Sequence, residues 1–300
     1  MQSDRKPEIN WPRLGFGLGL RAEHYDDVLG KRPSVDWFEV VTENFMDTGG
    51  RPLDVLESVR RDFPVALHGV SLSIGSADPL DDAYLTNLRA LADRIAPVLV
   101  TDHLCWTGVD GRSIYDLLPV PYTEETLDYV AGRVGQVQDR LGRRILLENA
   151  STYIEYRCSQ IPEAEFLASL AERADCGILL DVNNVFVTST NHGLDPHAYI
   201  DTIPTERVGQ FHLAGFTDMG GYLFDTHSAP VCDEVWSLYR HAVRRFGAGS
   251  TLVEWDAEIP SFERLRAESE RARSVAAEVE ATAGDPSAPG EPGAVEGATR

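Results

Sequence analysis

The amino-acid sequence predicts an α/β protein folded as a single (β/α)₈ barrel, also called a TIM barrel. The chain has 300 residues, somewhat more than the roughly 250 that such a barrel needs. Short apolar or β-branched runs alternate with segments of helical period, which is typical of parallel strands covered by helices. Most of these runs end in histidine, aspartate or glutamate, as expected where strand ends meet at one mouth of a barrel.

Eight runs are expected to form the barrel strands. They lie at residues 14–20, 37–42, 65–68, 98–102, 145–148, 178–181, 210–213 and 252–254. Eight strands with intervening helices favour a closed barrel over an open doubly wound sheet, although loop lengths alone do not separate the two folds.

The helices between these strands have recognisable ends. Thr123 is expected to cap a helix whose first turn carries two glutamates that suit the positive end of the helix dipole, and Gly142 follows its last turn. The other predicted helices run from Pro162 to near Gly177, over residues 235–246 before Gly247, and onward from a capping Ser261.

Composition divides the chain into one domain and a tail. Hydrophobic residues make up 43% and charged residues 25% of the chain, so its bulk is expected to bury one large core. Residues 1–275 are expected to form this catalytic domain. Residues 276–300 are rich in Ala, Gly, Pro and Glu, and they are expected to form an acidic tail that is disordered from about residue 280.

Charge and cysteine content exclude several classes of protein. The net charge of −21 disfavours nucleic acid and anionic membranes as partners. No run approaches a membrane span, and the first residues lack the apolar core of a secretory signal, so a cytoplasmic protein is expected. The four cysteines lack C-x-x-C spacing. They are expected to be reduced and mostly buried, with Cys105 filling core space more than binding metal.

Side chains able to bind metal lie at the ends of most predicted strands. They are Glu43, His68, Asp102, His103, Glu148, Asp181, Asn184, His212, Asp225, His227, Glu254 and Asp256. In a barrel these ends converge on one cavity, so the groups are expected to be neighbours. Unpaired charges packed that closely are very costly in a partly dry pocket, and divalent cations neutralise them. The repetition therefore predicts a cluster of metal ions.

Taken singly, several of these side chains have an ordinary structural explanation. His68 suits a hydrogen-bonded core histidine, Glu148 an ion pair with an arginine, and Asp225 with His227 a hydrogen bond within a loop. Only the repetition favours metal. A supporting or substrate-contacting role is expected for Glu43, Asn44, Asp102 and Asp256.

The donor set leaves the identity of the metal open. Oxygen and nitrogen ligands without thiolate suit iron, manganese or zinc. Two chemistries follow: iron(II) with open positions activates dioxygen, whereas zinc lowers the pKa of bound water and supports hydrolysis.

With these motifs the sequence resembles the multinuclear non-heme iron-dependent oxidative enzymes, from about Gly15 to Arg273. The resemblance rests on GLGLR, EVVTENFMDTGGRPLD, LHGVSLSIGS, TDHLCWTG, LLPVPYT, RRILLENAS, LLDVNNVFV, FHLAGF, DTHSAPV and TLVEWD. It implies a xylose-isomerase-like barrel that holds two or three iron ions, in mixed Fe(II) and Fe(III) states, and uses O₂ as co-substrate.

The resemblance also implies a function and a set of roles. Members modify ribosomally made precursor peptides, often at cysteine, with a leader-binding partner protein encoded nearby. The subgroup that this chain resembles makes thiooxazole or oxazolone-like groups on cysteine-containing peptides. The implied iron ligands are His68, His103, Glu148, Asp181, His212, Asp225, His227 and Glu254, with Asn184 as a ninth. Among them Glu148 is the implied bridging carboxylate, and the implied catalytic residues are Glu148, Asp181 and His227.

One departure and two alternatives accompany this resemblance. Many relatives read HLAGH where this chain reads HLAGF, so Phe216 replaces a polar group. The ligand order also resembles a trinuclear zinc endonuclease for abasic DNA, but Asn184 ends its D-x-x-H motif here and the charge of −21 disfavours DNA. A non-catalytic metal-binding protein is the other alternative, disfavoured because a stabilising site needs fewer groups.

Overall fold

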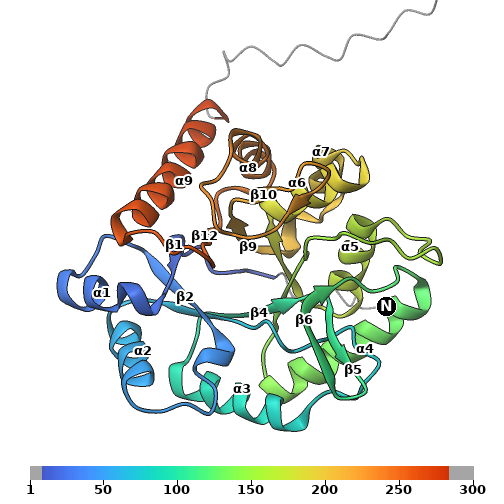
Figure 1. Cartoon of the computed structure of the whole chain (residues 1–300), viewed down its shortest axis with the longest axis horizontal. Coiled ribbons are helices and arrows are strands. Elements are labelled where there is room, and N and C mark those ends of the chain that lie inside the picture. Colours follow the sequence, from blue (N-terminus) through green and yellow to red (C-terminus); the bar gives the residue numbers. More distant parts are fainter. Residues whose placement is uncertain (1–8, 284–300) are drawn as a thin grey trace, which may run out of the picture.

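Eight parallel strands close into a barrel in the computed structural model, which describes residues 9–283 (Figure 1). Going round the barrel, the strands follow the order β1, β12, β9, β8, β7, β4, β3, β2. Their bounds are Gly15–Gly19 (β1), Trp37–Val41 (β2), Val65–His68 (β3), Leu99–His103 (β4), Leu146–Glu148 (β7), Gly177–Asp181 (β8), Val208–Leu213 (β9) and Ser250–Val253 (β12). The predicted barrel is confirmed, with every strand end within two residues of its expected place.

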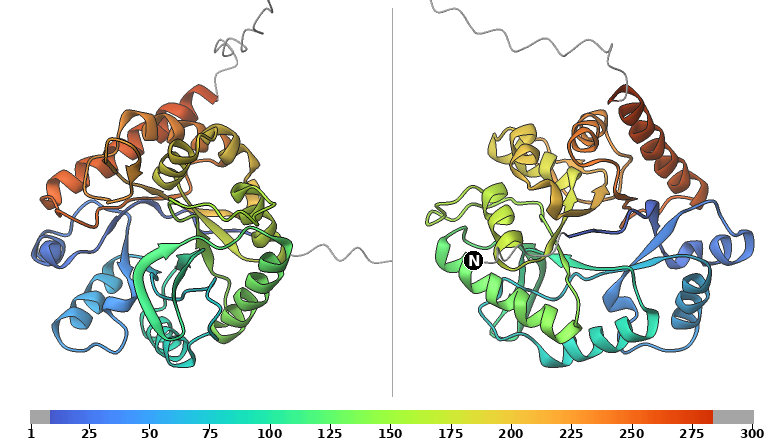
Figure 2. Two further views of the ribbon diagram at one scale, coloured as in Figure 1. Left: turned by 45° about the vertical axis from the view of Figure 1, so that its right-hand side comes forward. Right: turned by 180° about the vertical axis from the view of Figure 1, so that it is seen from behind.

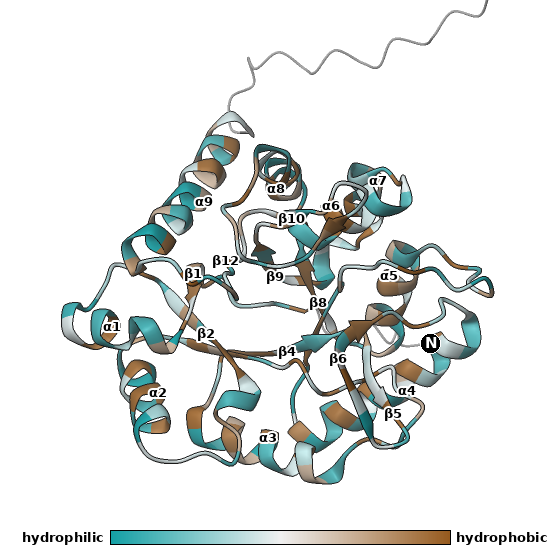
Figure 3. Ribbon diagram, viewed as in Figure 1, coloured by the Kyte–Doolittle hydropathy of each residue, from teal (hydrophilic) through white to brown (hydrophobic). Residues whose placement is uncertain are grey.

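Helices cover the outside of the barrel (Figure 2). Their bounds are Tyr25–Lys31 (α1), Arg51–Asp62 (α2), Asp82–Ile95 (α3), Glu124–Leu141 (α4), Glu163–Arg173 (α5), Val182–His192 (α6), Pro196–Thr202 (α7), Asp233–Phe246 (α8) and Phe262–Ala283 (α9), with short 3₁₀ turns at Ala22–His24, Thr42–Asn44 and Thr205–Arg207. The helices are amphipathic, and Figure 3 shows mixed polar and apolar residues along them.

The predicted helix boundaries are largely confirmed. Thr123 caps α4 by accepting a hydrogen bond from the backbone N–H of Thr126, and Gly142 ends that helix with a left-handed φ of 66°. Ser261 likewise accepts a hydrogen bond from the backbone N–H of Arg264 at the start of α9. The helix after Pro162 is shorter than expected, since α5 ends at Arg173.

Two small hairpins extend the loops beyond the carboxyl ends of the strands. β5 (Trp106–Val109) pairs with β6 (Arg112–Leu118) after β4, and β10 (Thr217–Asp218) pairs with β11 (Leu223–Phe224) after β9. Both were missing from the sequence prediction. They add walls beside the mouth of the barrel where the metal-binding side chains were expected.

The last helix corrects the expected boundary of the domain. α9 continues to Ala283, and its side chains Val275, Ala276 and Val279 are buried. This apolar face packs on α8 and β1. Residues 276–283 therefore belong to the domain and are not part of a disordered tail, whereas residues 284–300 lie outside the described residues.

An apolar layer fills the amino-terminal part of the barrel interior. It consists of Trp37, Ala66, Leu99, Leu146, Leu179 and Leu252. The Trp37 indole, which is fully buried, lies against Gly17 on the neighbouring strand. A Cβ atom at position 17 would overlap this ring, so glycine is needed there. The ring closes this end of the barrel interior and is called the Trp37 plug below.

Two further sequence expectations concern cysteines and membranes. All four cysteines are free; Cys105 and Cys176 are buried, Cys232 is half-buried and Cys158 is exposed. Among residues 9–283, no helix has the length and apolarity that a membrane crossing requires.

Candidate metal centre

Six of the predicted ligands lie in the barrel interior, closer to the carboxyl ends of the strands than the apolar layer. Side chains of a strand alternate between its two faces, so residues two apart both point inward. Ala66 is followed in this way by His68, and Leu146 by Glu148. The buried members of this metal-centre layer are His68, His103, Glu148, Asp181, His212 and Glu254.

Glu148 lies between three histidines. Its Oε2 atom is 3.3 Å from His68 Nε2 and 3.2 Å from His103 Nε2. Its Oε1 atom is 3.5 Å from His212 Nδ1. The two oxygens of one carboxylate thus face different histidines, which is the arrangement that a bridging ligand needs.

A second group of donors shares Glu148. Asp181, His212 and Glu254 each offer one ligand atom, and these atoms and one from Glu148 all lie within 4.8 Å of one another. His212 Nδ1 is 3.0 Å from Glu254 Oε2. Four nitrogen and oxygen donors this close suit a cation of the iron, manganese or zinc type.

A third group lies around His227, beyond β9. His227 Nδ1 is 3.3 Å from Glu254 Oε2 and 3.1 Å from Asp256 Oδ2, and its Nε2 is 2.7 Å from Asp225 Oδ1. The backbone of His227 has a φ of 44°, which is uncommon for a residue with a side chain. Its carbonyl accepts a hydrogen bond from the backbone N–H of Asp256, which holds this loop in place.

Hydrogen bonds fix the orientation of two histidine rings. His68 Nδ1 lies 2.7 Å from Thr101 Oγ1, and His103 Nδ1 lies 3.1 Å from the carbonyl oxygen of Gly69. Each contact leaves Nε2 directed at Glu148. Such contacts to the far ring nitrogen are typical of metal-binding histidines.

Burial and mutual charge determine the pKa values in this layer. Burial opposes ionisation of Glu148, but three neighbouring histidines, first His103, lower the pKa of that carboxyl to about 2. Burial, together with the charge of Glu148, raises the pKa of Asp181 to about 8. Burial disfavours a charged His212, yet three glutamates, first Glu39, raise its pKa well above the ordinary range. The carboxylates therefore require positive charge nearby, from protons or from metal ions.

Several buried atoms of the metal-centre layer and of the group around His227 have no hydrogen bond of normal geometry. They are Glu148 Oε2, Asp181 Oδ2, His212 Nδ1 and His227 Nε2. Leaving such atoms unsatisfied costs about 1 to 3 kcal/mol each, and more for charged groups. All four are donor atoms of the groups described above, so the residues present fit bound metal ions.

Asn184 is not brought into the cluster. Its Oδ1 accepts a hydrogen bond from Ser151 Oγ at 2.8 Å, and its Nδ2 donates to the backbone carbonyl of Asn149 at 3.1 Å. Both polar atoms of the amide are therefore engaged elsewhere, and the geometry gives no support for Asn184 as a ninth ligand. The preceding Asn183 instead donates to Asp225 Oδ1 at 2.9 Å.

The four expected supporting residues divide between two places. Asp256 contacts His227, and its other carboxylate oxygen is bonded to Arg21. Asp102 points away from the barrel interior, where it accepts a hydrogen bond from the backbone N–H of Leu72. Glu43 accepts hydrogen bonds from the backbone N–H groups of residues 70 and 71, and so holds the loop after β3. Asn44 is exposed beside it.

Sequence reasoning missed three residues of the site. Glu39 lies within β2, and its Oε1 is 2.8 Å from His212 Nε2. Gln210 donates to the other oxygen of Glu39 at 2.6 Å. Arg21 follows β1 and lies 3.8 Å from Glu254 Oε1. The signal for Glu39 was a lone carboxylate within the apolar run WFEVV.

Comparison with known protein families shows which family the chain belongs to. The family described as "RiPP precursor modification enzyme MbnB/TglH/ChrH" matches residues 15–277. The chain belongs to this family. RiPPs are ribosomally synthesised and post-translationally modified peptides, so the members are enzymes that act on precursor peptides, and the predicted resemblance is confirmed at the level of the family.

Two similar proteins carry the family label UPF0276. A UPF0276 protein of Anaeromyxobacter sp. is 57% identical over 270 residues, which cover 90% of this chain and 94% of that protein. A UPF0276 protein of Acaryochloris marina is 52% identical, over 86% of this chain and 93% of the relative.

Solved structures share the fold. A xylose isomerase domain-containing protein of Salmonella typhimurium aligns with a TM-score of 0.58 at 13% identity, over 90% of this chain and 98% of that one. Endonuclease IV of Thermus thermophilus aligns with a TM-score of 0.56 at 16% identity, over 89% and 100%. At these identities the likeness shows the xylose-isomerase-like barrel alone.

The departure at Phe216 has a simple structural counterpart. The ring of Phe216 packs on that of Phe186, with centroids 5.5 Å apart. An apolar contact therefore occupies this position after β9.

Proposed function

We propose that this member of the family is a multinuclear non-heme iron enzyme that uses O₂ to modify cysteine residues of a precursor peptide, giving thiooxazole- or oxazolone-type groups. Family membership supports the peptide substrate. The observation that carries the metal is the buried Glu148 carboxylate, whose two oxygens face different histidines while one of them lacks a hydrogen bond. Iron, O₂ and cysteine follow from the resemblance set out above.

The three donor groups give places for two or three ions. His68, His103 and Glu148 would hold the first. Asp181, His212 and Glu254, together with Glu148, would hold the second. A third would be held by His227 with Glu254 and Asp256, joined by the neighbouring Asp225. Iron(II) bound by histidine and carboxylate, with positions left open, supplies the activation of dioxygen.

The remaining residues of the site orient these donors. Thr101 and the Gly69 carbonyl fix the rings of two histidines, as described above. Arg21 binds Asp256 and lies near Glu254, so it offsets part of the negative charge at the mouth. Burial and the charge of Glu148 raise the pKa of Asp181 to about 8, so a metal ion bound here would take the place of a proton on this carboxyl.

Three residues are proposed to act most directly in the reaction. Glu148 joins the first two ion positions. Asp181 is the carboxyl with a raised pKa beside them. His227 has a side chain that is 10% exposed, the largest value among the four histidines of the cluster, and it is proposed to lie nearest to the incoming peptide.

The test combines metal analysis with peptide chemistry. Protein purified without oxygen should contain more than one iron per chain by elemental analysis. With iron and O₂, it should change the mass of a cysteine-containing precursor encoded near its gene, and serine in place of that cysteine should abolish the change, since a hydroxyl is a poorer iron ligand than a thiolate. The assay is run with and without the neighbouring gene product, the proposed leader-binding partner.

Two results would contradict the proposal. Activity with zinc alone, or an equal mass change under nitrogen, would favour the hydrolytic alternative. Efficient cutting of abasic DNA by the same preparation would favour it further.

A further inference from the structure

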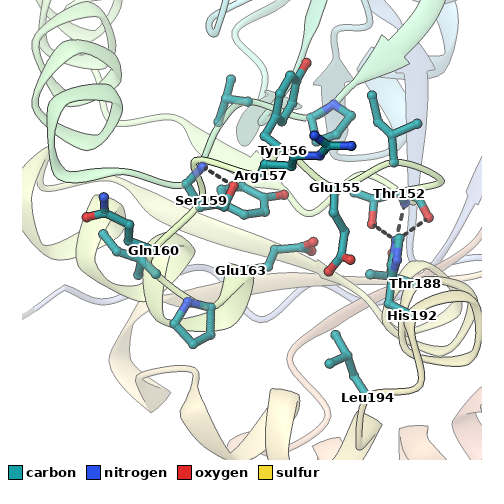
Figure 4. A pocket seen from close by; sticks show the side chains of 16 residues that line it. Thr152, Glu155, Tyr156, Arg157, Ser159, Gln160, Glu163, Thr188, His192 and Leu194 are labelled. Carbon is teal, nitrogen blue, oxygen red and sulfur yellow. Dashed lines mark hydrogen bonds between the residues drawn. The ribbon is translucent and has the colours of Figure 1, made fainter.

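A large pocket lies beside the metal centre and plays no part in the site described so far. Its cavity volume is about 540 Å³, within the range of roughly 300 to 1,000 Å³ that is usual for ligand sites. It is formed mainly by the loop between β7 and α5, with walls from the segment before α4 and from the end of α6 (Figure 4).

The pocket wall is largely apolar and partly aromatic. Tyr122 and Tyr156 contribute rings, and Ile154, Ile161 and Leu194 contribute aliphatic surface. Ile154 is 45% exposed and Leu194 is 50% exposed, which is unusual for two large apolar side chains in one place. These surfaces would be covered by a ligand with apolar parts.

Two carboxylates enter this apolar pocket, and the exposed Arg157 is the one arginine among its lining residues. Figure 4 shows the side chains of Glu155 and Glu163 both directed toward its centre. Neither forms an ion pair with another residue in the part of the chain that the structure describes. Glu163 Oε1 accepts a hydrogen bond from Tyr199 Oη at 2.8 Å. Burial raises the pKa of Glu163 to about 7, so a cation placed here would restore its charge.

The loop that forms the pocket also reaches the metal centre. Asn149 is bonded twice to the backbone of Asp181, each time at 3.0 Å. The hydroxyl of Tyr153 accepts a hydrogen bond from the backbone N–H of Asp225 at 3.0 Å. Thr152, which lines the pocket, comes four residues after Glu148, so the two are at most about 14 Å apart along the chain.

We propose that this pocket binds a lysine or arginine side chain of the precursor peptide, within about four residues of the residue that is modified. Two carboxylates and tyrosine rings are suited to an ammonium or guanidinium group. The upper limit of about 14 Å between these two backbone positions is the reach of about four residues of extended peptide, so one short peptide can span both places. The net charge of −21 also favours a basic ligand. The peptide part of this inference rests on the proposed function.

Binding is tested directly, under nitrogen and without turnover. The probe is a capped pentapeptide with lysine between four alanines, titrated into the full chain and followed by saturation-transfer NMR. Matched probes carry arginine or norleucine in place of lysine, and cadaverine supplies the ammonium group without a peptide backbone. Lysine and arginine peptides should bind at least tenfold more tightly than the norleucine peptide.

Three variants locate the binding. Glu155→Gln and Glu163→Gln should each weaken the lysine peptide several-fold. Glu165→Gln removes the same charge from an exposed position on α5 outside the pocket, and should leave the affinity unchanged. Because Glu155 is on an exposed loop, its variant keeps the test valid if Glu163→Gln folds poorly.

Each contrary result overturns a defined part of the proposal. Equal binding of lysine and norleucine peptides, or an equal loss in Glu165→Gln, would show that the pocket does not recognise the cation. Cadaverine binding as tightly as the peptide would assign the pocket to free amines. None of these outcomes depends on iron or O₂, so they leave the test of the proposed function separate.

Discussion

Two neighbouring layers of the barrel interior differ completely in chemistry although they are built on the same strands. The apolar layer contains Leu146, Leu179 and Leu252, whereas the metal-centre layer has Glu148, Asp181 and Glu254 two residues further along. The first has no polar side-chain atom at these positions, and in the second Glu148 Oε2 and Asp181 Oδ2 are buried without a hydrogen bond. Two residues further toward the carboxyl end of these strands, the barrel interior thus changes from an apolar core to a site that needs cations.

The strongest test of this contrast is Glu148→Gln. The variant keeps the size of the side chain but removes the charge that three histidines surround. We expect the loss of at least half of the bound metal, measured by elemental analysis, and the loss of peptide modification. Full metal occupancy in a folded variant would show that Glu148 does not bridge.

The matching change in the apolar layer is Leu146→Ala, on the same strand. Removing a fully buried leucine should lower the free energy of unfolding by about 2 to 5 kcal/mol, as measured by denaturant titration. Metal content per folded chain should stay unchanged. If metal is lost under conditions where circular dichroism shows a folded protein, the two layers are not separable.

A smaller effect is expected from Asn184→Ala, because this amide holds the loop around the cluster and not the metal. Loss of its bonds to Ser151 and Asn149 should destabilise the fold by about 1 to 3 kcal/mol. Elemental analysis should show unchanged metal. The informative comparison is Asn183→Ala, which removes a bond to Asp225 and should lower occupancy near His227.

The smallest effect is expected for Glu163, a buried carboxyl that lies outside the metal centre and accepts a hydrogen bond from Tyr199. The folded pKa of Glu163 is about 7 against an ordinary value of 4.5, so its contribution to stability is complete below about pH 4.5 and is lost as the pH rises through 7. Between pH 5 and 8 the melting temperature of the wild type should therefore fall by a few degrees relative to Glu163→Gln. Calorimetry measures this difference. If the melting temperatures of the wild type and Glu163→Gln changed in parallel with pH, as is expected for the wild type and Glu165→Gln, the raised pKa of Glu163 would be contradicted.

The fold was predictable because most of the predicted strands end in a residue that can bind metal. An apolar run ending in His68 or Glu148 reports both a strand and its carboxyl end. The two hairpins gave no such signal. Their short strands include polar residues and turn at glycine-containing segments, such as Gly220 with Gly221, which read as loops.

The site was predictable where a ligand ended a strand and not where its direction depended on register. Glu39 faces inward only because β2 places Trp37 inward as well, and the sequence WFEVV does not say which face that is. Asn183 and Asn184 are equally suited in the sequence, but the first turn of α6 directs only Asn183 toward Asp225. Such choices follow from helix and strand geometry in three dimensions.

The Trp37 plug closes the amino-terminal end of the barrel interior. Because this ring and its apolar neighbours fill the amino-terminal part of the interior, a molecule reaching the cluster has to arrive past the carboxyl ends of the strands and leave the same way. A long peptide lying across that mouth would shield the cluster from bulk solvent and delay the exchange of small molecules. The shape of the barrel would then determine the order in which the peptide and small molecules bind. A kinetic scheme would have to specify which of them enters first.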